Sequence, residues 1–335
     1  MTAMNQAANS GAIRISAIIP AYNVAPYIGA ALDSLLAQSA PFHEIIVVDD
    51  GSSDGTEAIL AQYQAQAGVR VVRVPNGGQG RARNLALTLA SGEFVYFFDA
   101  DDLLASNFVA DMQAMLAQQP EADIVYFSGS SFMDAGCSAD FLPAYRRRLS
   151  GSFASGVAAT GALLQQQSCF ASPCLYLSRR SLWQGGALAF LPIIHEDEEL
   201  ITRLTCKAGL SLCTDTVYFA RRVRAESTMT QTKNERHASG YLQTLASLAQ
   251  QCRAERAALA PIEAQMVRRF YSILGGYLAI CKAIGARPRY RALLRHVRTL
   301  ARLPSLRQLV EMTASNDLKA GLSRVRRTLT FSRTG

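Results

Sequence analysis

Short apolar runs and amphipathic segments alternate along the first part of the chain. Five runs of β-branched, aromatic and other apolar residues predict buried strands at residues 15–20, 44–48, 69–74, 94–98 and 124–127. Between them, residues such as Ile28, Leu32 and Leu35 recur at the spacing of a helix face. Strands and helices that alternate with loops of a few residues indicate βαβ units. We therefore predict an α/β fold with a mostly parallel sheet and flanking helices.

The pattern changes after about residue 130. Residues 132–151 predict loops and strands that extend the sheet, because Gly136, Pro143 and the basic run 146–148 interrupt the periodicity. Further apolar patterns predict helices at 154–167, from 179–183 onward and after residue 199, and strands at 173–177 and 210–219. Beyond about Lys233 the spacing is helical throughout. The chain thus divides into an α/β domain over residues 13–230, with two halves that meet near residue 130, and a helical C-terminal region over 233–335.

Two of the predicted strands end abruptly in acidic residues. One runs into Asp49 and Asp50, and the other runs into Asp99, Asp101 and Asp102. The carboxyl ends of parallel strands meet at one edge of the sheet, which is where open α/β sheets bind ligands. Carboxylate oxygens there suit Mg²⁺ or Mn²⁺ and, through the metal, a diphosphate. The alternative is that these acids cap the helices that follow, although one acid is enough for a cap.

The net charge of +8 is concentrated at the C-terminal end. Residues 287–335 hold 12 Lys and Arg against two Asp and Glu, whereas the preceding residues hold 22 against 24. Four arginines, at positions 291, 295, 298 and 302, share one face of a predicted amphipathic helix. Such a face suits an anionic partner, a packing contact or solvent. Nucleic acid is not expected, because only Tyr290 and Phe331 could stack on bases.

Other features exclude several classes of protein. The chain lacks an apolar run of the ~18 residues that span a bilayer, and residues 1–11 lack the apolar core of a signal peptide. We therefore expect a cytoplasmic protein. Its seven cysteines form no CxxC pair, so structural zinc is not predicted. The glycine motif Gly77–Gly80 follows the third strand and not the first, which argues against a dinucleotide-binding loop.

Five motifs in order resemble glycosyltransferase family 2. They are Pro20–Asn23, Val48–Thr56, Gly77–Gly78 with Ala82–Asn84, Asp99–Asp102, and Glu196–Asp197. The resemblance covers about residues 13–230 and implies a GT-A (nucleotide-diphospho-sugar transferase) fold with a nucleotide-binding half, about 13–130, and an acceptor half, about 131–230. Within the family, the likeness is greatest to bacterial enzymes that build cell-surface polysaccharides.

The resemblance also implies roles for the nucleotide-binding residues. Asp50 would accept the uracil N3–H, since a carboxylate is only an acceptor. Pro20 and Tyr22 would pack against the base and ribose, and Arg83 would contact the base or the diphosphate. Asn84 is expected to pack locally. Guanine or thymine remains an alternative base.

The acidic motif and the later segments would complete the site. Asp99 would hold the ribose and Asp101 the Mn²⁺ or Mg²⁺, while Asp102 would assist through water or cap the next helix. Asp197 is the expected catalytic base, with Glu196 and Glu198 as alternatives. His195 is expected to orient neighbours.

Two arginines of a later loop, Arg222 and Arg224, match family positions that could bind the diphosphate. Glu226 departs from the family, where glycine is usual, so the path of that loop is open. The QxxRW motif of processive synthases is absent from the sequence, which favours single sugar addition.

The predicted function is therefore inverting, metal-dependent transfer of a sugar from a nucleotide-sugar, with UDP as the favoured nucleotide, to a glycan or lipid-linked acceptor. We also expect peripheral contact with an anionic membrane through residues 287–330. The alternatives are a non-catalytic nucleotide-sugar binding or scaffold protein, and a nucleotidylyltransferase. The latter would place a basic, glycine-rich loop after the first strand, where this chain has Ala21–Asn23.

Overall fold

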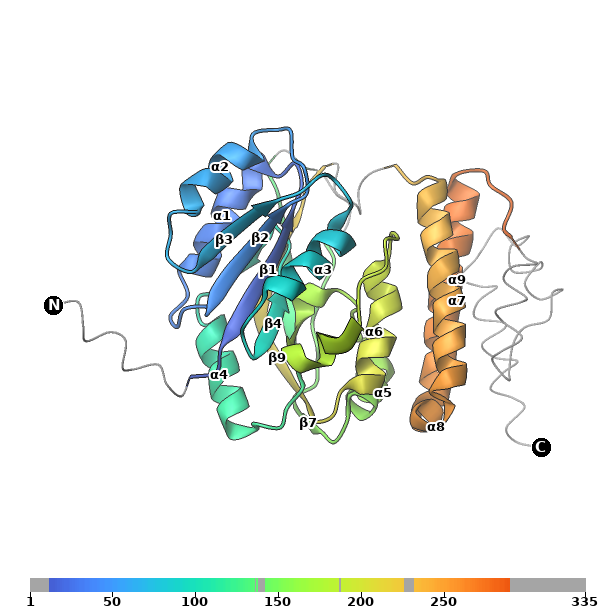
Figure 1. The fold of residues 1–335 in the computed structure, drawn as a ribbon. Helices are drawn as coiled ribbons and strands as arrows, with labels where there is room; N and C mark the ends of the chain where they lie inside the picture. The colour runs from blue at the N-terminus through green and yellow to red at the C-terminus, as the bar shows by residue number, and fades with distance from the viewer. Residues whose placement is uncertain (1–11, 136, 138–141, 187, 226–231, 290–335) are drawn as a thin grey trace, which may run out of the picture.

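A single mixed sheet forms the centre of the molecule, with helices on both of its faces (Figure 1). The computed structural model describes residues 12–135, 137, 142–186, 188–225 and 232–289. Within these ranges the sheet has nine strands: the order is β3-β2-β1-β4-β8-β6-β9-β5, and β7 pairs with β9.

The N-terminal half of the sheet is parallel, as the βαβ pattern predicts. Its elements are β1 (Ile15–Ala21), α1 (Ala25–Leu36), β2 (Glu44–Asp49), α2 (Thr56–Tyr63), β3 (Val69–Arg73), α3 (Gln79–Leu89) and β4 (Phe94–Phe97). Strands β1, β2 and β4 are mostly apolar without alternation because both faces of the sheet are covered there, whereas the edge strand β3 exposes Arg70 and Arg73. In β1, for example, Ile19 packs into the core on one face and Ile18 into the core on the other.

The other half of the sheet mixes directions. Its elements are β5 (Leu103–Leu104), α4 (Phe108–Gln118), β6 (Ile124–Met133), β7 (Gly151–Phe153), α5 (Gly156–Gln165), β8 (Tyr176–Arg179), α6 (Glu196–Lys207) and β9 (Ser211–Val223). Strand β8 runs antiparallel to both β4 and β6, while β6 and β9 are parallel. The predicted α/β sheet with flanking helices is confirmed, and each antiparallel pair of named strands involves at least one strand of this half.

One strand prediction was wrong at its start. The run 173–177 was expected to be a strand, but residues Pro173–Leu175 form a 3-10 turn and the strand begins at Tyr176. Pro173 has no N–H for a ladder, and the Ser172 hydroxyl accepts a hydrogen bond from the Cys174 N–H, which favours the turn. The helix expected from residue 179 is likewise a 3-10 segment, Arg180–Gly186.

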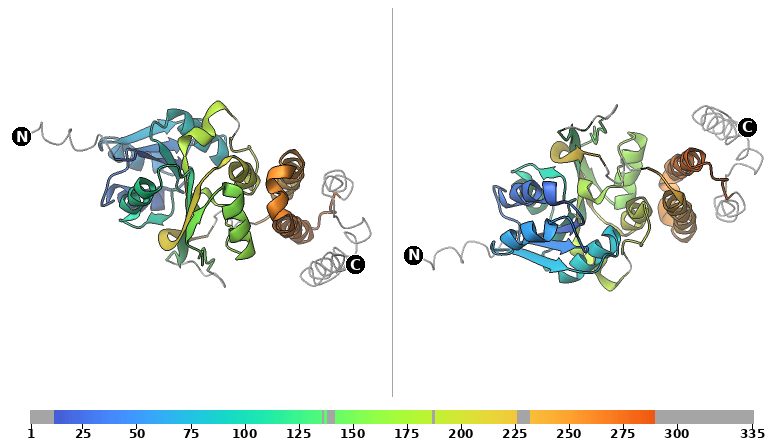
Figure 2. Two further views of the ribbon diagram at one scale, coloured as in Figure 1. Left: turned by 90° about the horizontal axis from the view of Figure 1, so that it is seen from below. Right: turned by 90° about the horizontal axis from the view of Figure 1, so that it is seen from above.

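A helical pair follows the sheet. Helices α7 (Glu235–Ala254) and α9 (Glu263–Ala283) are joined by α8 (Arg256–Leu259) and the 3-10 turn Ala260–Ile262. They share an apolar core around Leu245, Phe270 and Leu274. Figure 2 shows this pair (orange) lying against the flank of the sheet domain that carries α5 and α6. None of the helices in the described ranges is long and apolar enough to cross a membrane. The basic face predicted near residues 291–302 lies outside those ranges.

Candidate active site

A cavity of about 840 Å³ opens at the carboxyl edge of the sheet. It is lined by segments that follow β1, β2 and β4, by the start of α6, by the end of β9 and by the first turns of α7. All nine residues that the sequence analysis assigned to the site line it: Pro20, Tyr22, Asp50, Arg83, Asp99, Asp101, Asp197, Arg222 and Arg224. Residues from six separate segments of the chain therefore converge on one space, as parallel strands with a common ligand-binding edge predict.

Asp50 organises the loop that leads into α3. Its buried carboxylate accepts hydrogen bonds from the backbone N–H of Gly77 at 2.8 Å and of Gly78 at 2.7 Å. Gly78 has a φ of 90°, a conformation that side chains disfavour, so glycine suits this position. The carboxylate thus fixes a loop at the cavity wall and still has lone pairs for a ligand.

Arg83 joins two acids that are far apart in the sequence. Its guanidinium, 2% exposed, lies 2.6 Å from Asp99 Oδ1 and 2.7 Å from Glu196 Oε1. Burial alone would lower the pKa of Arg83, but Asp99 and Glu196 outweigh burial and raise it. Arg83 therefore connects the segment after β4 to the start of α6.

The acidic segment after β4 is matched by arginines from the end of β9. Asp101 Oδ2 lies 2.7 Å from Arg224 Nε, and Asp102 accepts the backbone N–H of Arg222 at 2.7 Å. Arg222 also forms an ion pair of 2.8 Å with Asp134. The alternative that Asp102 caps the next helix was wrong, because α4 begins at Phe108 with Asn107 at its N-cap.

The acids after β4 have the ligand chemistry of a divalent-cation site. Burial, and then the neighbouring Asp99, raises the pKa of Asp101; burial, and then Asp101, raises that of Asp102. Such crowded carboxylates favour a cation beside them. In the described ranges, no three His, Cys, Asp or Glu side chains are grouped to hold a metal alone. Mg²⁺ in particular is commonly bound by one or two carboxylates plus substrate phosphates.

Helix α6 presents its first turn to the cavity. His195, at its N-cap, has a φ of 72°, and burial lowers the pKa of its imidazole to about 4. Burial, and then Asp197, raises the pKa of Glu196 to about 7, although Arg83 opposes this. Asp197 lines the cavity, and its Oδ1 accepts the backbone N–H of Glu198 at 2.8 Å. Across the part of the chain that the structure describes, no other side chain pairs with Asp197.

Sequence reasoning missed one wall of the cavity. Four of its lining residues are Lys233, just before α7, and Arg236, His237 and Tyr241 in the first turns of α7. They were assigned to the helical C-terminal region, and no site role was expected for them. Helical periodicity identifies a buried face but not the element against which that face packs, so the sequence held no direct signal for this wall.

Comparison with solved structures identifies the class of fold. The TarS fragment 1-349 from S. aureus, solved in complex with UDP-GlcNAc, superposes with a TM-score of 0.68 at 21% identity, over 96% of this chain and 91% of that one. A Pyrobaculum calidifontis mannosyltransferase in complex with GDP-Man and Mn²⁺ gives a TM-score of 0.52 at 23% identity, over 97% and 89% of the two chains. The chain has the GT-A fold.

Sequence comparison identifies the family of the N-terminal segment. Residues 16–147 match the family model described as glycosyl transferase family 2. A putative teichuronic acid biosynthesis glycosyltransferase, TuaG from Bacillus subtilis, is 46% identical over 90 residues, which are 26% of this chain and 36% of that protein. The matches span about a third of the length of the first curated relatives. The likeness to family 2 glycosyltransferases is therefore that of residues 16–147.

Proposed function

We propose that this chain is an inverting, metal-dependent glycosyltransferase that moves a sugar from a nucleotide-sugar donor to a glycan or lipid-linked acceptor. One observation carries the proposal. The cavity combines the residues expected for a nucleotide diphosphate with Asp197, an acid whose carboxylate is left open toward the cavity while its neighbours are paired.

Asp197 would act as the general base. A carboxylate that takes the proton from the acceptor hydroxyl lets that oxygen attack C1 of the donor sugar from the face opposite the leaving nucleotide. The C1–oxygen bond to the diphosphate breaks as the new bond forms, so the configuration at C1 inverts. Asp197 needs no acidic partner on the leaving-group side, because the leaving diphosphate is already a stable anion.

Arg222 and Arg224 would bind the departing diphosphate. Both line the cavity beside the acids that follow β4. An arginine presents several N–H donors to phosphate oxygens and keeps its charge at any working pH. Asp101, with Asp99 beside it, would hold Mn²⁺ or Mg²⁺, which when bound would neutralise charge on the diphosphate.

Comparison with other proteins supports parts of this proposal. The S. aureus TarS fragment binds UDP-GlcNAc, and the mannosyltransferase binds GDP-Man with Mn²⁺. These two structures hold different bases, so the uracil contact that we assign to Asp50 rests on the motif resemblance and on the acceptor chemistry of a carboxylate. TuaG is linked by its name to teichuronic acid biosynthesis. We infer that the acceptor belongs to a cell-surface polysaccharide, and that the enzyme works at the inner face of the membrane.

A nucleotide panel tests the donor half of the proposal. Thermal unfolding is followed with UDP, GDP, dTDP and CMP, each with Mn²⁺, with Mg²⁺ and with EDTA. A ligand that binds only the folded state raises Tm by mass action. We expect a metal-dependent rise with UDP. A rise with GDP or dTDP instead would refute the uracil assignment, and no rise with any nucleotide would favour a non-catalytic scaffold.

An Asp197→Asn variant tests the catalytic half. We expect transfer and donor hydrolysis to fall by at least ~100-fold, the usual share of a general base, with UDP binding unchanged. Asp215→Asn is the matched control, because Asp215 is an exposed acid on β9 outside the cavity lining. Full activity of the Asp197→Asn variant would show that another residue is the general base.

A further inference from the structure

The first turn of α6 consists of four consecutive acids, Glu196 to Glu199. Successive residues of an α-helix point about 100° apart, so four of them point in four directions around the axis. The residues after this turn give α6 a buried apolar side, with Leu200, Ile201 and Leu204 in the core, but hydrophobicity does not determine what holds each acid of the turn itself. The partners of the acids show which carboxylates are held and which one is left for the cavity.

Three of the four acids are held by partners from different elements. Glu196 is bound by Arg83 of α3, at 2.7 Å. Glu198 Oε2 lies 2.6 Å from Arg269 Nη2 of α9, and the same nitrogen donates to the Glu198 carbonyl at 3.2 Å. Glu199 pairs with Arg203 of its own helix.

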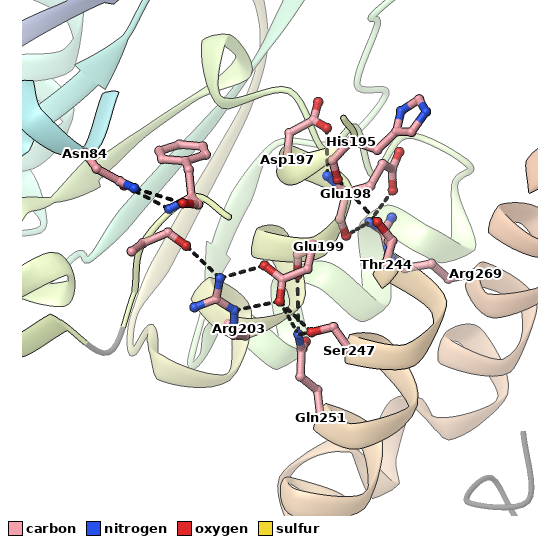
Figure 3. Close-up of polar contacts among 12 residues, drawn as sticks. Asn84, His195, Asp197, Glu198, Glu199, Arg203, Thr244, Ser247, Gln251 and Arg269 are labelled. Carbon is pink, nitrogen blue, oxygen red and sulfur yellow. Dashed lines mark hydrogen bonds and ion pairs between the residues drawn. The ribbon is translucent and has the colours of Figure 1, made fainter. Parts of the chain in front are cut away.

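The Glu199 carboxylate also receives hydrogen bonds from α7, through Ser247 and Gln251. Figure 3 shows Glu198 and Glu199 engaged by α9 and α7, while the Asp197 carboxylate points away from both. Asp197 is thus the acid that remains for the cavity.

Helix α7 also contacts the residues that enter α6. The His195 ring stacks on Tyr241 with centroids 3.8 Å apart, and Thr244 Oγ1 donates to the His195 carbonyl at 3.4 Å. Gly240 lies so close to this segment that an added Cβ would overlap the carbonyl oxygen of Ile194. Helix α7 thus contacts the residues just before the acidic turn, and α7 and α9 hold the last two acids of the turn.

We propose that Arg269 is a positioning residue that fixes the rotation of α6 and thereby points Asp197 into the cavity. Its catalytic meaning rests on the function proposed above. Arg269 is buried, with 8% of its surface exposed, and Glu198 is the acid with which it forms an ion pair. A buried guanidinium requires its carboxylate, so the pair holds α6 to α9 in one register. The helical pair α7–α9 is then part of the active site's framework and not an appended region.

Hydrogen–deuterium exchange tests the positioning without any substrate. The variants are Arg269→Met and Glu198→Gln, and the matched control is Arg268→Met, which removes an exposed arginine from the adjacent position of the same helix. We expect the amides of residues 198–204 to exchange faster than in the wild type in both variants. In the control these amides should exchange at the wild-type rate, and in all three proteins the N-terminal half of the sheet should do so too. Wild-type exchange across α6 in a folded Arg269→Met protein would overturn the proposal.

Turnover tests whether this positioning serves catalysis. The probe is UDP release from UDP-GlcNAc with Mn²⁺, with water as the acceptor. We expect kcat to fall by roughly 10–100-fold in Arg269→Met, since small misplacements of a reacting group have effects of that size. The Kd for UDP should stay at the wild-type value, and Arg269→Lys should recover part of kcat. The double variant Arg269→Met with Glu198→Gln should be no slower than either single variant, because both remove one interaction.

The two measurements separate this inference from the proposed function. Suppose that α6 exchanges faster in Arg269→Met but the wild-type protein turns over no nucleotide-sugar. The positioning role of Arg269 would then be supported, and the proposed glycosyltransferase function would be refuted. Normal turnover and UDP binding in Arg269→Met, with UDP released by the wild type, would overturn the catalytic role of Arg269 and leave the proposed function intact.

Discussion

At the scale of single residues, the site depends on charges that are buried in pairs. Arg83 is the clearest case, because its guanidinium is enclosed between Asp99, Glu196 and the face of Phe190. A buried ion pair adds little to stability in itself, but removal of one partner leaves an uncompensated charge. The geometry therefore makes Arg83 more sensitive to substitution than an ordinary helix arginine.

We expect Arg83→Met to lower the free energy of unfolding by about 3 kcal/mol or more, because Glu196 would remain buried without its cation. Urea denaturation measures the change. Arg81→Met is the control, since Arg81 is exposed on the same helix. Equal stabilities of the two variants would show that Glu196 is satisfied without Arg83.

His195 links stability to pH. Burial lowers the pKa of its imidazole to about 4, against 6.5 for the free group. Between these values the unfolded chain binds a proton that the folded chain does not, so this residue makes stability fall as the pH drops from about 6.5 toward 4. His195→Asn should flatten the pH dependence of Tm in that window, and asparagine tolerates the φ of 72°. An unchanged slope would show that His195 titrates normally in the fold.

The candidate residues themselves were predictable from the sequence to a large extent. Acids directly after buried strands, such as Asp50 and Asp99, mark the ligand edge because strand polarity alone places them there. Their partners were not predictable. Arg83 bridges Asp99 and Glu196 because α3 lies beside the start of α6. Arg83 and Glu196 are 113 positions apart in the sequence, and no local pattern predicts a contact over that separation.

At the scale of elements, the elements with a strong local pattern were predicted well. Strands β1, β2 and β4 are mostly apolar and buried because both sheet faces are covered, which gives them a clear signature. The antiparallel position of β8 between β4 and β6 had no such signature, since strand order in the second half depends on long connections. The close approach of α7 to the 193–195 segment was equally hidden.

Gly240 makes this approach of α7 testable. Alanine in place of glycine within a helix ordinarily raises the free energy of unfolding of the protein by roughly 0.5–1 kcal/mol. Here we expect Gly240→Ala to destabilise by about 1–3 kcal/mol, because its methyl group would meet the Ile194 carbonyl oxygen and push α7 away. The change in Tm on thermal unfolding shows whether the substitution stabilises or destabilises the protein. Ser239→Ala, at the exposed neighbouring position, is the control. A stabilised Gly240→Ala protein would contradict the close contact.

At the scale of the whole molecule, the sheet domain and the helical pair share one cavity. Acids assigned to the nucleotide and the metal, such as Asp50 and Asp99, follow strands of the parallel half of the sheet, whereas Lys233 precedes α7 and His237 and Tyr241 lie on it. The sequence suggested a boundary near residue 233, because strands stop there and helices follow. The structure shows that this change of secondary structure does not separate the site from the helices. The division of the α/β domain into a nucleotide half and an acceptor half stays a prediction.

The uneven charge of the chain leads to the last prediction. Residues 287–335 carry 12 of the 34 Lys and Arg but only two of the 26 Asp and Glu. Basic residues near an anionic leaflet contribute on the order of 1 kcal/mol each. We therefore expect the full chain to bind vesicles of phosphatidylglycerol and phosphatidylcholine. Replacement of Arg291, Arg295, Arg298 and Arg302 by glutamine should weaken that binding by at least ~100-fold in a flotation assay.

Lysine at the same four positions is the matched control, since it keeps the charge and should keep the binding. Added salt should weaken the wild-type interaction, because exposed charges are screened. If the glutamine variant floats with the vesicles as well as the wild type does, the arginines serve another purpose, such as contact with a second protein. The acceptor would then have to reach the cavity without help from a membrane-bound enzyme, which would favour a soluble glycan over a lipid-linked one.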